Sequence, residues 1–160
     1  MAWHDDWLIL LPQYPAFNGG EGDGRLFALP RADILAYVDG RKEGPLTPAE
    51  IPLIAPGLSG AVPGYEGFEA IAFAGSRAYL TIEASPLSGM TGHLVAAEMA
   101  ADRSQLVIDT ERITVVASAS GLPNKSDEAL LLAGGQILTM HEVNGAKLVD
   151  APVAQRFNDD

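Results

Sequence analysis

Cysteine is absent from this 160-residue chain, which excludes a disulfide framework, thiolate catalysis and a thiolate zinc site. Positive charge is scarce, because 10 Lys and Arg stand against 21 Asp and Glu and give a formal net charge of −11. A surface this acidic repels a phosphate backbone, so we expect no nucleic-acid partner and favour cations, metal ions above all. The hydrophobic content of 48% is nevertheless high enough for a packed core.

Long hydrophobic runs are also lacking. The longest apolar stretches, such as residues 51–56 and 129–133, are far shorter than the roughly 18–20 residues of a membrane-spanning helix, so we expect no membrane partner. The first six residues include two aspartates, whereas a secretory signal has basic residues and an apolar core. We therefore expect a cytoplasmic protein.

Glycine and proline, in contrast, recur at short intervals, with 17 and 11 residues respectively, and leave little room for long helices. Between them lie short runs rich in Leu, Ile, Val, Phe and Tyr, a composition typical of strands of about five residues. Such runs predict strands at residues 7–11, 26–28, 68–73, 78–82, 93–97, 105–109, 113–117, 128–132, 136–140 and 147–149. Only residues 32–37 and 98–103 indicate a turn or two of helix. Many short strands with frequent turns predict an all-β fold: a sandwich, a barrel or a propeller.

An internal repeat is the most informative feature of the chain. Residues 68–75, Phe-Glu-Ala-Ile-Ala-Phe-Ala-Gly, and residues 127–134, Asp-Glu-Ala-Leu-Leu-Leu-Ala-Gly, each precede a second apolar run that ends in a glutamate. Glu128 follows Glu69, and Glu142 follows Glu83, by the same 59 positions. Each copy therefore predicts two strands joined by a glycine turn.

Regular antiparallel pairing would place the two glutamates of each copy opposite each other, with Glu69 facing Glu83 and Glu128 facing Glu142. Directly opposed Cβ atoms are about 4.5–5.5 Å apart. Like charges at that distance destabilise the pair and raise one of its pKa values unless a cation lies between them. A bound cation is one explanation of this twofold pattern; solvated strand ends, or ion pairs with lysines such as Lys125, are the other.

A propeller would give these carboxylates a common position. Its blades of about four strands surround a central channel, and a period of 59 residues fits such a blade with generous loops. Glutamates of successive blades would then meet at one mouth of the channel. Converging oxygen ligands suit Ca²⁺ or Mg²⁺, and Asn124 and Asp127, just before Glu128, offer further oxygens.

At these residues the sequence resembles the bacterial six-bladed β-propellers of the esterase-like phytase group. The carrying motifs are Gly-Phe-Glu-Ala-Ile-Ala at 67–72 with Thr-Ile-Glu at 81–83, and Asn-Lys-Ser-Asp-Glu-Ala at 124–129 with His-Glu at 141–142. A more distant likeness runs to calcium-dependent propeller hydrolases of the paraoxonase and gluconolactonase type. In that group, carboxylate and Asn side chains hold a channel calcium that polarises an ester, lactone or phosphotriester.

The resemblance implies Glu69 and Glu128 as the first metal ligands, Asn124 as the next, and Glu83 and Glu142 as alternates. It also implies a divalent metal cofactor, with Ca²⁺ first. We therefore expect a metal-dependent hydrolase whose partner is a small-molecule substrate, namely a phosphoester, phosphotriester or lactone bound at the channel mouth. The alternative is a non-catalytic propeller that binds a ligand or partner and uses the cation to hold its ring together.

The length fits half of such a ring. A third, looser copy of the repeat aligns residues 9–13 with residues 79–83 and places Gln13 where Glu83 stands. We expect one half-propeller domain over residues 1–160, with a partial blade at about 5–60 and blades at about 61–120 and 121–160. Because three blades alone would expose long sheet edges, we predict that two chains close into a six-bladed homodimer.

Four further side chains are candidates at the channel mouth. His141 and Glu142 are adjacent, and either would serve there as a general base or ligand. A hydrogen-bonded strand histidine is the simpler interpretation of His141. Tyr65 and Phe68 would line a substrate pocket, or would equally well pack between blades.

Overall fold

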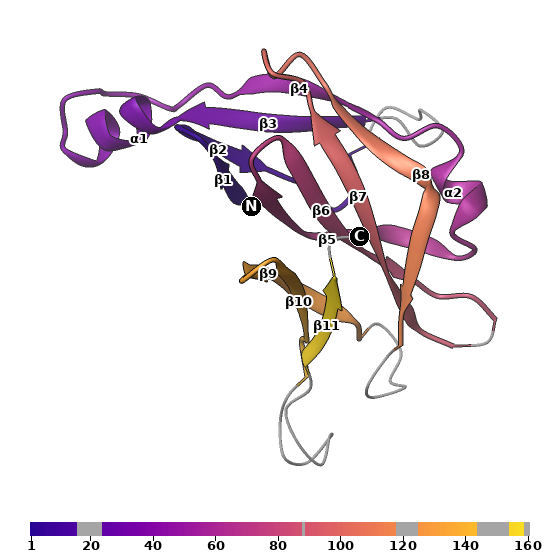
Figure 1. Ribbon diagram of the computed structural model, residues 1–160. Helices are drawn as coiled ribbons and strands as arrows, with labels where there is room; N and C mark the ends of the chain where they lie inside the picture. Colours follow the sequence, from indigo (N-terminus) through magenta and orange to yellow (C-terminus); the bar gives the residue numbers. More distant parts are fainter. Residues whose placement is uncertain (16–23, 88, 118–124, 144–153, 159–160) are drawn as a thin grey trace.

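The computed structural model describes residues 1–15, 24–87, 89–117, 125–143 and 154–158. The first part is an antiparallel meander, which we call the first meander (Figure 1). Its strands are β1 (Ala2–His4), β2 (Trp7–Leu10), β3 (Gly24–Pro30) and β4 (Ala49–Ile54). The predicted strands at 7–11 and 26–28 are thus confirmed.

Four longer strands form the second meander, in which each strand pairs antiparallel with the next. They are β5 (Tyr65–Ala74), β6 (Arg77–Ala84), β7 (Thr91–Met99) and β8 (Leu106–Val116). β8 joins the two strands predicted at 105–109 and 113–117 into one. Its pairing with β7 shifts register between Val95 and Ala97, so a bulge accommodates the polar residues in its middle.

The third meander contains the second copy of the repeat. Its strands are β9 (Asp127–Ala133), β10 (Gln136–His141) and β11 (Ala154–Asn158), and β10 lies between the other two. The hairpin of β9 and β10 has a left-handed glycine turn at Gly134, as the hairpin of β5 and β6 has at Gly75. The strand predicted at 147–149 lies outside the described residues.

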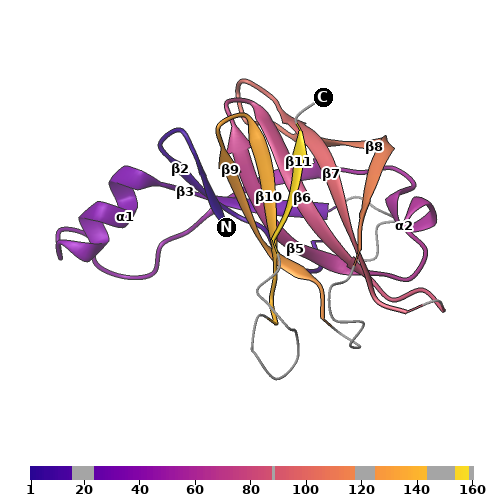
Figure 2. The same ribbon diagram turned by 60° about the horizontal axis from the view of Figure 1, so that its bottom comes forward.

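The two helices are short. α1 (Arg31–Val38) follows Pro30, which provides the fixed φ suited to a helix start, and it projects away from the sheets in both ribbon views (Figures 1 and 2). α2 (Leu58–Ala61) precedes β5. The helical turn predicted at 98–103 is wrong, since this segment contains the end of β7 and a turn. None of the helices in the described ranges is both long and apolar enough to span a membrane.

The first and second meanders join into one eight-stranded sheet, because β4 and β8 pair in parallel through Leu53 with Leu106 and Ile54 with Val107. The two strands at the ends of this sheet, β1 and β5, contact each other, so the sheet is barrel-like and nearly closed. The predicted all-β class is confirmed. Separate blades and a dimer are not visible in the described residues, and both stay predictions.

The main hydrophobic core lies between the first and second meanders. From the first it takes the inward-facing residues of β2, β3 and β4, such as Ile9, Leu26 and Leu53. From the second it takes Leu80 and Ile82 of β6 and matching residues of β5, β7 and β8. Alternation along each strand places these side chains on one face of each meander.

A second core lies on the opposite face of the second meander, where the third meander covers it (Figure 2). Tyr79, Leu94 and Val116 meet Ile137 of β10, and Leu130 of β9 packs against them. The three meanders therefore lie face to face in chain order, and the second is covered on both faces.

Candidate functional site

The first repeat hairpin has a β-bulge, which corrects the predicted register. Gly67 lies opposite Glu83, and Ala70 lies opposite Thr81, so Glu69 is the extra residue on its strand. The prediction that Glu69 faces Glu83 is therefore wrong. It assumed uninterrupted pairing, whereas one inserted residue shifts every later partner by one position.

The second hairpin repeats the irregularity at the corresponding place. Asp127 pairs with His141, and Ala129 pairs with Met140, which leaves Glu128 as the extra residue. Glu142 donates its backbone N–H to the carbonyl oxygen of Ser126 at 3.0 Å, so its cross-strand partner is Ser126, although its side chain lies close to that of Glu128. Because a bulge redirects a side chain, both copies turn this glutamate away from the regular sheet face.

The four glutamates of the repeat still lie within electrostatic reach of one another. The pKa of Glu69 is raised from 4.5 to about 7, chiefly because burial penalises its charged form. The negative charges of Glu83, Glu128 and Glu142 add to this rise. Burial and the charge of Glu142 likewise raise the pKa of Glu128. We call these four residues the four-glutamate cluster.

Glu83 is the most buried member of the cluster, with only 3% of its surface exposed. Burial raises its pKa, and Glu66, Glu142 and Glu128 raise it further through their negative charges. The Ser126 hydroxyl lies beside Glu83 and partly offsets this rise in pKa, although the two side chains form no hydrogen bond of standard geometry. Glu83 Oε1 has no hydrogen-bond partner within the described part of the chain, an arrangement that is costly for a charged oxygen.

Gln13 brings the segment after β2 to the cluster. Its Nε2 donates a hydrogen bond of 2.9 Å to Glu69 Oε1. Its carbonyl oxygen accepts one of 2.9 Å from the Phe68 N–H. This close approach needs a glycine at position 67, since an added Cβ would lie 2.7 Å from the Gln13 oxygen and the backbone has a φ of 143°.

One basic side chain already compensates part of the negative charge. Lys125 Nζ lies 2.8 Å from Glu142 Oε2, and the Glu142 side chain is only 16% exposed. The hydrogen bond to Glu142 is the main cause that raises the pKa of Lys125. The negative charges of Glu142, Glu128 and Glu83 raise it further. The ion pair that the sequence left open as an alternative is thus present.

His141 and Asp127 lie in the interior beside the cluster. His141 is 1% exposed, and its Nδ1 accepts a hydrogen bond of 3.1 Å from the Val143 N–H. Burial raises the pKa of Asp127, although Thr139 Oγ1 donates a hydrogen bond of 2.7 Å to its Oδ1. The bond to Val143 is the kind that a structural strand histidine makes.

The two predicted pocket residues occupy different environments. Phe68 is 2% exposed and belongs to the main core, and its ring meets that of Tyr65 edge to face with centroids 5.9 Å apart. Tyr65 is half-buried beside the cluster, where burial and the charge of Glu69 raise its pKa to about 12. Phe68 therefore packs, whereas Tyr65 presents a protonated hydroxyl near the carboxylates.

Asn124, the remaining predicted ligand, lies outside the described residues. Within the described ranges, no three His, Asp or Glu side chains lie close enough together to hold a metal ion as they stand. The sequence analysis missed Ser126 as the neighbour of Glu83. The repeat contained no signal for this contact, because Ser126 corresponds to Gly67, the partner of Glu83, and the offset therefore places Ser126 beside Glu142.

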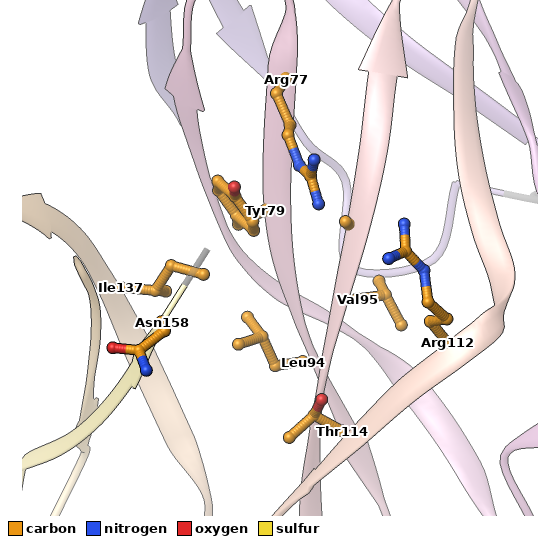
Figure 3. A pocket seen from close by; sticks show the side chains of 9 residues that line it. Arg77, Tyr79, Leu94, Val95, Arg112, Thr114, Ile137 and Asn158 are labelled. Carbon is orange, nitrogen blue, oxygen red and sulfur yellow. The ribbon is translucent and has the colours of Figure 1, made fainter. Parts of the chain in front are cut away.

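A separate pocket lies between the second and third meanders (Figure 3). Arg77 stacks over the ring of Tyr79 at 5.6 Å, and Arg112 Nε lies 2.8 Å from Asp109 Oδ2. Its space of about 70 Å³ is well below the roughly 300–1,000 Å³ of typical small-molecule sites. Arg77 begins β6 whereas Glu83 lies near its end, so this pocket is remote from the cluster.

Comparisons of this chain with known protein families, with curated proteins and with solved structures find no match.

Proposed function

We propose that the four-glutamate cluster binds a divalent cation, with Ca²⁺ first, and that the protein hydrolyses phosphoesters, phosphotriesters or lactones there. One observation carries this proposal: the buried Glu83 Oε1 has no hydrogen-bond partner among the described residues, and the negative charges of Glu66, Glu142 and Glu128 act on it. Such a cluster, which Lys125 compensates only in part, destabilises the fold, and a cation offsets the remaining charge.

The donor set has the chemistry that such a cation requires. Carboxylate oxygens are the ligands that Ca²⁺ and Mg²⁺ prefer, and calcium tolerates flexible geometry. Glu83 and Glu69 would hold the ion, with Glu128 as the ligand from the third meander. Since no three carboxylates in the described part of the chain are close enough together, binding would draw these side chains inward.

When bound, the cation supplies a Lewis acid for a phosphoryl or carbonyl oxygen and lowers the pKa of a coordinated water. The predicted pair His141 and Glu142 remains the candidate for proton transfer, because Glu69, as a ligand of the cation, would keep its negative charge. Tyr65 remains protonated and suits donation of a hydrogen bond to the substrate.

A propeller-like arrangement forms part of this proposal, as does closure of its ring by a second copy. Support comes from the face-to-face order of the three meanders and from the contacts of β5 with both β1 and β9. In a propeller, the first strands of successive blades lie side by side in this way around the axis. The parallel pairing of β4 with β8 is an additional feature that joins two of the outer strands.

Calcium titration of Glu83→Gln tests the cation site directly. We expect the wild-type protein to gain thermal stability with Ca²⁺, and the variant to be more stable without metal but to lose the calcium response. Glu111→Gln is the matched control, because Glu111 is an exposed glutamate on β8 and should leave the response unchanged. An equal calcium response in Glu83→Gln and the wild type would contradict the site.

Hydrolysis is tested separately on the calcium-loaded protein with ester, phosphotriester and lactone substrates. We expect activity that EDTA removes and Ca²⁺ restores, and that Glu69→Gln lowers by about 10-fold or more, because it removes a ligand of the cation. Calcium binding without turnover on any of these substrates would contradict the hydrolase and leave the cation site in place.

The second candidate function is the non-catalytic propeller with a structural cation. The ion pair of Lys125 with Glu142 favours it, because this lysine already neutralises one carboxylate without a metal. In that case chelation should lower stability strongly, and no substrate class should be turned over.

A further inference from the structure

An apolar patch covers the outward face of the first meander. Ile9 and Leu26 point into the main core, so alternation turns their neighbours on β2 and β3 to the opposite face. The front patch, as we call it, consists of Trp3, Leu8, Leu10, Phe27 and Leu29, which cross-strand pairing brings together. Trp3 is 48% exposed, and the Arg31 guanidinium lies over its ring at 5.7 Å.

A second patch lies on the outward face of the third meander, at the other end of the stack. Leu130 and Ile137 pack toward the second meander, so their neighbours point away from it. The back patch consists of Ala129, Leu131, Ala133, Leu138 and Met140. Leu131 is 54% exposed and Met140 is 45% exposed. Contiguous apolar surface of this kind marks an interaction site.

The repeat shows what kind of surface covers the back patch. By the 59-residue offset, Leu131 and Leu138 correspond to Ala72 and Tyr79, which lie opposite each other on the second meander. Tyr79 is 3% exposed, because the third meander covers it. In the second copy of the repeat, the same face is left largely uncovered by the described residues.

The front patch of the first meander corresponds to the face with which the third meander covers Tyr79. In the looser third copy of the repeat, Leu8 and Leu10 align with Ala78 and Leu80. Both of these pack from the second meander onto the first. We call the face that packs on the preceding meander the front face and the opposite face the back face. Each interface inside the chain thus joins the front face of one meander to the back face of the preceding meander. The two faces that the described residues leave uncovered are one of each kind.

We propose that a second copy of this chain covers both patches: the back patch of each copy packs on the front patch of the other. Two such contacts, related by a twofold axis, close six meanders into one ring and leave no free patch. The proposal shares the stacked meanders with the proposed function but needs no cation, so metal binding and dimer formation are tested independently.

Light scattering during size-exclusion chromatography tests the proposal, with Leu10→Glu on the front patch and Leu131→Glu on the back patch. We expect the wild type to have twice the 16.8 kDa mass of one chain. Each variant should dissociate roughly 100-fold more readily, because each contact would bury an unpaired carboxylate. Leu87→Glu is the matched control, since Leu87 is fully exposed outside both patches and should leave the mass unchanged.

Mixing the two variants identifies the partner surface. Leu10→Glu retains its back patch and Leu131→Glu retains its front patch, so the mixture should form heterodimers through one intact contact. If Leu10→Glu fails to fold by circular dichroism, Trp3→Ser replaces it, because Trp3 is already half exposed. A monomeric wild type, an open polymer, or a variant that remains a full dimer would overturn the proposal.

Discussion

The second and third meanders contain two copies of one hairpin in different surroundings. Seven of the eight residues of β6 are buried, because the first and third meanders cover both of its faces. β10 alternates instead, with Ile137, Thr139 and His141 buried and the residues between them more exposed. The repeat therefore specifies strand, turn and bulge, whereas burial depends on which meanders lie on either side.

The largest expected difference comes from truncating the same repeat position in both copies. Ile71→Ala, in the main core, should lower the free energy of unfolding by about 3–4 kcal/mol. Leu130→Ala, at the half-buried equivalent in the third meander, should cost about 1–2 kcal/mol. Urea unfolding measures both values, and equal costs would show that the third meander is as well covered as the second.

Exchanging residues at the bulge should show that the two copies are not interchangeable. Gly67→Ser introduces the residue that the second copy has at position 126, but its Cβ would meet the Gln13 carbonyl. We expect a loss of about 2–3 kcal/mol from this clash and the positive φ. Ser126→Gly, the reverse exchange, should cost less than about 1 kcal/mol in the same unfolding assay. A tolerated Gly67→Ser would refute the close approach of Gln13.

Substitution of the turn glycine should lower the stability equally in the two copies of the hairpin. Gly75 and Gly134 have φ values of 62° and 59°, and nothing lies within 4 Å of an added Cβ at either. Alanine at each position should therefore cost about 1–2 kcal/mol, from backbone strain alone. Thermal unfolding would show two nearly equal shifts; a clear inequality would mean that the turns differ in more than their surroundings.

The smallest expected effect is a pH dependence of stability that originates at Glu69. Its pKa rises from 4.5 in the unfolded chain to about 7 in the fold, so the folded state binds more protons between these values. Stability should therefore fall as the pH rises from about 4.5 to 7 and then level off. Glu69→Gln should remove part of this fall, by a few degrees in Tm. Identical pH profiles of variant and wild type would refute the shift.

Much of the strand content could be predicted from local composition, because short apolar runs between turn residues have few alternatives. The strands that escaped prediction lack that signal. β11 has the sequence Ala-Gln-Arg-Phe-Asn and is a strand because it pairs with β10. β4 contains Pro52, which argues against a strand, yet β3 and β8 pair with it on either side.

The proximity of the four glutamates was predicted from the sequence, but their geometry was not. The constant offset of Glu69 and Glu83 from Glu128 and Glu142 indicated that like positions would recur. It could not reveal the bulges, since an extra residue leaves no gap in the sequence when both copies contain it. The Lys125 ion pair was one of several open choices, because a flexible lysine reaches many partners.

By itself, the sequence determined the all-β class, the repeated hairpin and the acidic character of the chain, since these follow from local residue patterns and from charge. Only the tertiary structure decided the rest: which faces of the meanders meet, where β4 joins β8, and which carboxylate is buried without a partner. These features depend on contacts between residues far apart in the chain, and the free energy of those contacts is not encoded in any single segment.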